Sequence, residues 1–215
     1  MAGLRFIDLF CGIGGFRFAL EELGHACVFS SDDDPHAQKT YSLNFGETPC
    51  GDLTEIEASS VASHDVLCAG FPCQPFSKSG AQEGFEDQTR GTLFHDICYL
   101  AEKHSPAVLF LENVPNLVAH DNGNTMKVIE ARIEEIGYKY WRKIISPHNY
   151  GTCQIRKRVY IVCIRNDLVQ DFDYTFPKER QFDLDIRTVL DQTADAKYSM
   201  NKDEIYSHPS NLTVK

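Results

Sequence analysis

Short apolar runs that alternate with amphipathic stretches constrain most strongly what this chain can fold into. The runs have the length of buried strands, and apolar residues recur at helical spacing between several of them. Such alternation is typical of a doubly wound, mostly parallel α/β sheet. The expected strands are residues 4–10, 26–30, a short one ending at 51–54, 66–69, 107–112, 138–146 and 159–164.

The expected helices have recognisable start and stop signals. Asp34 followed by Pro35 predicts an N-cap and a first-turn proline. Gly24 and Gly137 follow amphipathic stretches and suit the left-handed conformation that often ends a helix. The expected helices are residues 16–23, 35–44, 93–102 and 126–136.

The chain has 215 residues, of which 42% are hydrophobic, enough for one well-packed domain with some residues left over. The pattern weakens after Asn166, so we expect one domain over residues 1–165 and an extended tail over residues 166–215. There is no signal-peptide layout and no apolar stretch of membrane-spanning length, which predicts a protein without a membrane anchor. Eight cysteines without a CxxC pair argue against a metal site or a disulfide framework and predict a reducing cytoplasm.

The net charge of −10 is unfavourable for a nucleic-acid-binding protein, because phosphate contacts dominate that affinity. Basic residues do gather at residues 154–158. DNA binding is therefore compatible with this sequence only if another segment supplies a wider positive surface.

Cys73 lies between Pro72 and Gln74-Pro75, directly after the expected strand at residues 66–69. The prolines stiffen this turn, and the carboxyl end of a strand is where open α/β sheets keep their sites. Most unpaired cysteines are small buried hydrophobic residues, but this setting favours a nucleophile, which requires a lowered thiol pKa. We expect the other cysteines to be buried and structural: Cys11, Cys27, Cys50, Cys68, Cys98, Cys153 and Cys163.

A glycine turn follows the first expected strand. A dinucleotide-binding fingerprint starting at Gly12 would need glycine at position 17, which is Arg17 here. Gly12, Gly14 and Gly15 instead suit a compact anion such as an amino-acid carboxylate. Acids after the second strand could accept hydrogen bonds from a ribose, and Asp52 could accept one from an adenine amino group. A tight turn beside two solvated acids explains these features equally well.

Four motifs in order resemble the cytosine-C5 DNA methyltransferase family, in its small bacterial restriction–modification form. The motifs are Phe10–Gly15, Pro72–Gln74, Glu112–Val114 and Gln154–Tyr160. The resemblance extends from residue 4 to about residue 177 and includes residues 84–87, 90–94 and 120–124. It implies a Rossmann-like methyltransferase fold that binds S-adenosylmethionine and releases S-adenosylhomocysteine.

The resemblance also implies roles for the motif residues. Cys73 would add to C6 of a flipped cytosine, and Glu112, followed by Asn113, would hold N3 and the exocyclic amine. Arg158 would contact O2, and Arg156 would support the loop or a phosphate. The DNA-contacting candidates are Ser77, Ser79 and Arg90.

The implied cofactor site comprises three groups of residues. Phe10, Gly12, Ile13 and Gly14 would surround the methionine part of the cofactor, Asp32 would bind the ribose, and Asp52 with Leu53 would meet the adenine. Gly70, Pro72 and Leu93 would complete the pocket. Asp33 stands where related enzymes often have an aromatic residue that stacks on adenine, worth about 1 kcal/mol, so we expect weaker cofactor affinity. The sole tryptophan, Trp141, is expected in the sheet.

The chain stops where the family continues into a target-recognition domain and two closing motifs that pack against the cofactor site. We therefore expect the catalytic half of a divided or truncated bacterial enzyme that acts on double-stranded DNA with a second polypeptide. Two alternatives stay open. One is an RNA cytosine-C5 methyltransferase, although the Cys-Phe-Thr signature of that branch is absent. The other is an inactive remnant or binding subunit.

Overall fold

The computed structural model describes residues 3–72, 92–169, 173–180, 182 and 185–188. Within them, one mixed sheet has the strand order β2-β1-β3-β4-β6-β5. The strands are β1 (Arg5–Leu9), β2 (Ala26–Ser31), β3 (Val66–Ala69), β4 (Val108–Asn113), β5 (Tyr138–Ile145) and β6 (Arg158–Arg165). β1 to β4 pair in parallel, whereas β6 is antiparallel to both β4 and β5.

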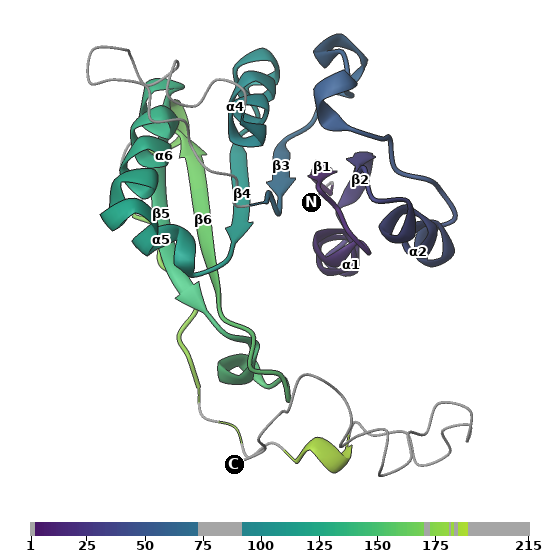
Figure 1. Ribbon diagram of the computed structural model, residues 1–215, viewed down its shortest axis with the longest axis vertical. Coiled ribbons are helices and arrows are strands. Elements are labelled where there is room, and N and C mark those ends of the chain that lie inside the picture. The colour runs from purple at the N-terminus through teal and green to yellow at the C-terminus, as the bar shows by residue number, and fades with distance from the viewer. Residues whose placement is uncertain (1–2, 73–91, 170–172, 181, 183–184, 189–215) are drawn as a thin grey trace.

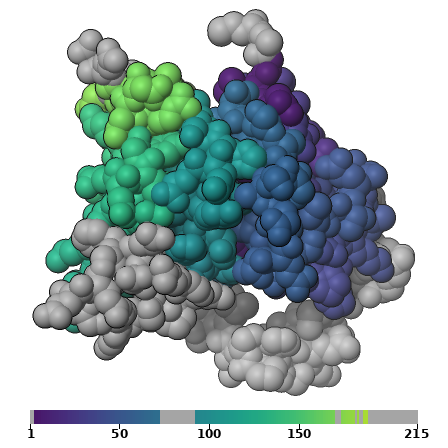
Figure 2. All heavy atoms as spheres, turned by 90° about the horizontal axis from the view of Figure 1, so that it is seen from above, coloured from purple at the N-terminus to yellow at the C-terminus, as the bar shows by residue number. Residues whose placement is uncertain are grey.

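Helices cover both faces of this sheet. They are α1 (Gly15–Glu22), α2 (Pro35–Phe45), α4 (Leu93–His104), α5 (Asn116–Ala119) and α6 (Asn124–Glu135). Alternate residues of β1 divide between two apolar clusters: Ile7 packs with residues of α4 and α6, and Phe6 packs on the α1 side. α1 lies next to β2 and α6 next to β5 (Figure 1), and seen from above the two halves of the chain pack side by side (Figure 2). The doubly wound α/β prediction is therefore confirmed.

The local helix signals act as predicted. The Asp34 side chain accepts a hydrogen bond of 2.8 Å from the His36 amide at the start of α2. Gly24 and Gly137 adopt φ values of 84° and 87° just after α1 and α6. Trp141 lies in β5, where its Nε1 donates to Asp173.

Two sequence-based expectations are wrong. No strand forms at residues 51–54: a single bridge joins Ser31 to Cys50, and the Asp52 side chain then caps a 3₁₀ turn at Leu53–Glu55. A carboxylate that bonds its own downstream amide competes with a sheet ladder. The second wrong expectation is that Cys50, Cys27 and Cys153 are buried. Cys50 is exposed because its bridge lies on the outer side of β2, the edge strand of the sheet. Cys27 and Cys153 are only half-buried. The remaining described cysteines, Cys11, Cys68, Cys98 and Cys163, are buried as expected.

Across the described residues, no helix is long and apolar enough to cross a membrane. In the same part of the chain, no three His, Cys, Asp or Glu side chains are grouped so that they could hold a metal ion.

Candidate functional site

The turn between β1 and α1 has an unusual backbone. Phe10 and Gly12 have φ values of 54° and 55°, and Gly14 has 93°. A Cβ on Gly14 would stand 2.1 Å from the Phe45 ring, so only glycine fits there. The Gly12 amide donates to Asp32 Oδ2 at 2.8 Å, which ties the turn to the end of β2. A bulky residue such as Phe10 in the left-handed region costs energy, and strained residues of this kind cluster at functional sites.

A cavity of about 530 Å³ opens where β1, β2 and β3 end. Its wall combines most of the predicted cofactor residues with three others. The lining is Phe10, Ser31, Asp32, Asp33, Gly51, Asp52, Leu53, Thr54, Gly70, Pro72 and Leu93. The predicted Gly12 and Ile13 line a neighbouring cavity instead, and Gly14 is buried in the turn.

This wall fits the adenosine part of S-adenosylmethionine. Leu53, Leu93 and Pro72 offer apolar surface, while Asp32 and Asp52 place carboxylate acceptors near it. Each carboxylate is already oriented. Asp32 accepts from the amides of Gly12 and Asp34, and Asp52 accepts from the amide and hydroxyl of Thr54.

Two further features concern the edges of this cavity. The Ser31 hydroxyl is buried beside this wall and has no hydrogen-bond partner among the described residues. Asp33 is exposed, and Phe10 is the one aromatic residue among those that line the cavity.

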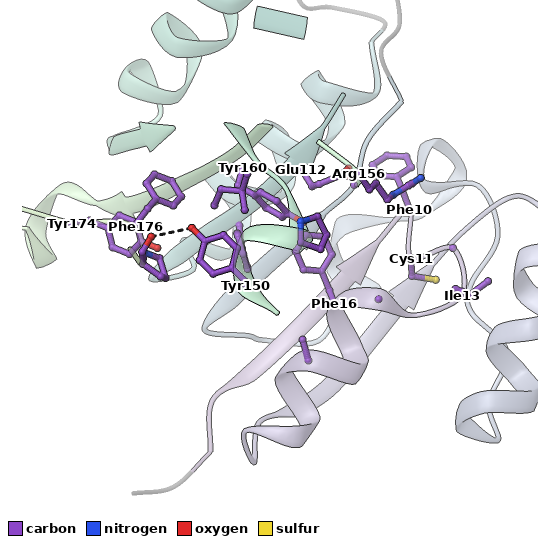
Figure 3. Close-up of a pocket in the computed structure, with 18 residues that line it drawn as sticks. Phe10, Cys11, Ile13, Phe16, Glu112, Tyr150, Arg156, Tyr160, Tyr174 and Phe176 are labelled. Atoms are coloured by element: carbon purple, nitrogen blue, oxygen red, sulfur yellow. Dashed lines mark hydrogen bonds between the residues drawn. The ribbon is translucent and has the colours of Figure 1, made fainter. Parts of the chain in front are cut away.

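Figure 3 shows a second cavity, of about 770 Å³. Phe10 and Gly70 line this cavity as well as the first. Glu112, at the end of β4, and Arg156, in the loop before β6, lie on its wall. The remaining lining residues are Cys11, Gly12, Ile13, Gly15, Phe16, Ala19, Phe110, Ile145, Pro147, Tyr150, Tyr160, Tyr174, Phe176 and Pro177.

Glu112 forms an ion pair with Arg158, with 2.8 Å between Oε1 and Nε. Partial burial raises the pKa of the Glu112 carboxyl, and the positive charges of Arg158 and Arg156 act against this rise. Both partners are about four-fifths buried, at 23% and 19% side-chain exposure. The site therefore places a carboxyl with a raised pKa next to a fixed cation, an arrangement suited to a polar ring that offers both a donor and acceptors.

Asn113 does not share this cavity. Strand side chains alternate between faces, so Asn113 points to the opposite side of β4 from Glu112. It is 3% exposed, and its amide nitrogen donates to the Phe71 carbonyl at 2.8 Å.

Cys73 and the DNA-contacting candidates Ser77, Ser79 and Arg90 lie outside the described residues, so their roles stay predictions. The described chain leads up to Cys73 through Gly70 and Pro72, directly after β3. Because β1, β3 and β4 are parallel, their carboxyl ends share one edge, where Phe10, Gly70 and Glu112 lie.

Sequence reasoning missed the aromatic wall of the larger cavity. Phe16 meets Phe110 edge-on with 5.1 Å between ring centroids, and Phe110 lies 5.8 Å from Tyr160. Tyr150 joins the wall through a hydrogen bond from its hydroxyl to the Pro177 carbonyl. No signal in the sequence marks this wall, because the run in β4 reads as uniformly apolar and only the structure shows that every second residue is half-buried.

Comparison with known proteins shows which family has this sequence. A family model described as C-5 cytosine-specific DNA methylase matches residues 4–215. The Type II methyltransferase M.HhaI of Haemophilus parahaemolyticus is 50% identical over 180 residues, covering 83% of this chain and 55% of that protein. M.MspI of Moraxella sp is 50% identical over 187 residues, covering 87% of this chain and 44% of that protein. The chain thus spans about half the length of these relatives.

Solved structures confirm the predicted Rossmann-like methyltransferase fold. The Entamoeba histolytica methyltransferase EhMeth matches with a TM-score of 0.72 and 22% identity, over 96% of this chain and 66% of that one. The S. pombe Dnmt2 methyltransferase matches with a TM-score of 0.69 and 23% identity, over 95% and 66%. With the family model matching almost the whole sequence, the chain belongs to the C-5 cytosine-specific DNA methylase family.

Proposed function

We propose that the protein transfers a methyl group from S-adenosylmethionine to C5 of cytosine in double-stranded DNA. The observation that carries this proposal is the Glu112–Arg158 pair, which lies at the sheet edge where Gly70 and Pro72 lead into Cys73. A carboxyl, a guanidinium and a cysteine after a proline turn are the groups that the chemistry requires. Family membership supports the same reaction.

Cys73 is the proposed nucleophile. Its thiolate forms a bond to C6 of the ring, and the displaced electron pair makes C5 nucleophilic, which divides one difficult step into easier ones. When bound, S-adenosylmethionine supplies the methyl group that C5 takes up. Loss of the C5 proton then expels the thiolate and restores the ring. The cytosine must first be flipped out of the duplex.

Glu112 and Arg158 orient and polarise the base in this proposal. A carboxyl with a raised pKa can donate to N3 and accept from the exocyclic amine. Arg158 holds that carboxyl in place and donates to O2, while the exposed Arg156 contacts the loop or a phosphate. Ser77, Ser79 and Arg90 belong to the segment that would contact DNA.

The cofactor would lie across the two cavities. Phe10, Gly12, Ile13 and Gly14 would surround its methionine part, Asp32 would accept from the ribose hydroxyls, and Asp52 with Leu53 would meet the adenine. Gly70, Pro72 and Leu93 would complete the wall. Asp33 offers a carboxylate and no ring, so the absence of stacking there predicts weaker cofactor affinity.

Base recognition belongs to another part of the enzyme, in the same protein or in a second polypeptide. Residues 1–165 would form the catalytic domain and residues 166–215 the tail leading towards that part. The net charge of −10 supports this division, because most of the phosphate contacts would then come from that other part.

Tritium transfer from labelled S-adenosylmethionine tests the proposal. The chain is assayed on mixed-sequence DNA and on tRNA, alone and with the product of the neighbouring reading frame. We expect label in DNA, and none with Cys73→Ser at an unchanged melting temperature. Label in tRNA alone would favour an RNA methyltransferase. Absence of label in both nucleic acids under every condition would favour an inactive remnant. Full activity of Cys73→Ser would refute the nucleophile.

A further inference from the structure

The segment that leaves β3 is tied to β4 by a side chain and not by the sheet ladder. The parallel pairing of β3 with β4 ends at Ala69 and Leu111. Beyond it, Asn113 Nδ2 donates to the Phe71 carbonyl at 2.8 Å, and Asn113 Oδ1 accepts from the Val114 amide at 2.8 Å. The buried amide thus continues the connection between the two strands after the ladder has stopped.

Phe71 is anchored at its ring as well as at its carbonyl. The ring is 4% exposed and packs 5.6 Å from Phe94, the second residue of α4. On either side of Phe71 the chain forms walls: Gly70 lines both cavities, and Pro72 lines the smaller one. Any displacement of the Phe71 carbonyl therefore moves surface in both cavities.

We propose that Asn113 is a positioning residue that fixes the Gly70–Pro72 segment against the end of β4 and so sets the wall shared by the two cavities. This inference rests on the proposed function for its meaning, because the two cavities are the proposed base and cofactor sites. Asn113 faces away from Glu112 and acts through the Phe71 carbonyl, so its role differs from the catalytic one that its motif implies.

Two substitutions remove the donor to the Phe71 carbonyl. Asn113→Ala removes the whole amide, whereas Asn113→Asp keeps an acceptor for the Val114 amide. We expect both variants to lower kcat by about 10- to 100-fold, the range that small misplacements in a site produce. The rate of covalent adduct formation with 5-fluorocytosine DNA should fall by the same factor, and S-adenosylmethionine affinity in calorimetry should weaken.

Tyr138→Phe is the matched control. It removes a buried donor to another backbone carbonyl, that of Pro106, at the opposite end of β4, where Tyr138 OH lies 2.7 Å away. It should lower the melting temperature without changing the adduct rate or the cofactor affinity. Phe94→Leu loosens the same segment from its ring side and should reproduce the Asn113 effects, even if the Asn113 variants fold poorly.

Adduct formation and cofactor affinity at wild-type values in the folded Asn113 variants, or in Phe94→Leu, would overturn the inference. An equal loss of adduct rate and cofactor affinity in Tyr138→Phe would also overturn it, because such a loss would indicate a general effect on stability. If the wild-type full chain with its partner forms no adduct, the proposed function fails, and calorimetric cofactor affinity alone then decides the role of Asn113.

Discussion

Asp8 is a fully buried acid in β1, an inner strand of the sheet. Burial raises the pKa of its carboxyl from 3.8 to about 8, although the backbone amide and the positive charge of Arg17 act against the rise. The folded protein therefore favours the protonated carboxyl, and folding in neutral solution takes up a proton. The contribution of this carboxyl to the free energy of unfolding is fully present below the unfolded pKa of 3.8, and it is lost as the pH rises towards 8.

Asp8→Asn should remove that pH dependence. Between pH 4 and 8 the wild-type free energy of unfolding should fall with a slope of up to about 1.4 kcal/mol per pH unit from this group. The variant should show a flatter curve and greater stability at pH 8, measured by urea unfolding. The exposed Asp121→Asn controls for the loss of one charge. Parallel curves for Asp8→Asn and wild type would contradict the role given to burial.

At the residue scale, the family motifs predicted which side chains come together, while the roles of these side chains stay predictions. Glu112 and Arg158 were expected in one site, and the structure pairs them at 2.8 Å. The orientation of Asn113 and the left-handed φ of Phe10 could not be predicted, because each depends on contacts with segments distant in the sequence. The face of a strand residue follows from register, which the motif alone does not specify.

At the scale of elements, the signals within a few residues were the most reliable. The Asp34-Pro35 pair predicts the start of α2, and the structure has both the cap and the proline there. The expected strand at residues 51–54 failed because its apolar residue Leu53 belongs to a turn capped by Asp52. In both places an aspartate side chain that caps the next turn determined the local structure. Only the Asp34-Pro35 pair was recognisable as a helix start in the sequence.

Asp34→Ala tests the cap of α2. Loss of the hydrogen bond to the His36 amide should cost about 1 kcal/mol of unfolding free energy in denaturant titration. Asp34→Asn keeps an acceptor and should recover most of it. Equal stability of all three proteins would mean that the fixed conformation of Pro35 is sufficient to start the helix.

Arg17 shows what an element-level prediction leaves out. The sequence correctly indicates that an arginine replaces the third glycine of a dinucleotide fingerprint. The structure adds that Arg17 is buried, pairs with Glu21 at 2.8 Å and with Glu47, and donates to the Tyr41 hydroxyl. Glu47 follows α2, so this cation joins the first two helices of the fold. A partner thirty residues away leaves no periodic signal in the sequence.

At the scale of the whole molecule, charge opposes the proposed substrate. The chain has 31 acidic and 21 basic residues. Among the described residues, Arg156 and Lys157 are exposed beside the larger cavity and are suited to meet phosphates.

We expect the chain alone to bind duplex DNA more weakly than about 10 μM at physiological salt, with a shallow dependence on salt concentration. Fluorescence anisotropy from about 50 to 200 mM salt measures both quantities. Arg156→Ala and Lys157→Ala should each reduce the salt slope by about 1. Tight binding with a steep slope would mean that residues 73–91 or the residues after position 188 supply many more phosphate contacts than the charge balance suggests.

Phe10 and Gly70 line both cavities, and this has a consequence for inhibitor design. A bisubstrate compound, with an adenosine-like head linked to a pyrimidine, can use both spaces by passing over Gly70. A Cβ at that position would stand 3.6 Å from Glu112 Oε2, an ordinary contact, so the fold tolerates alanine there while the passage narrows. A substitution of Gly70 by alanine could therefore give resistance to such a compound while the fold is kept.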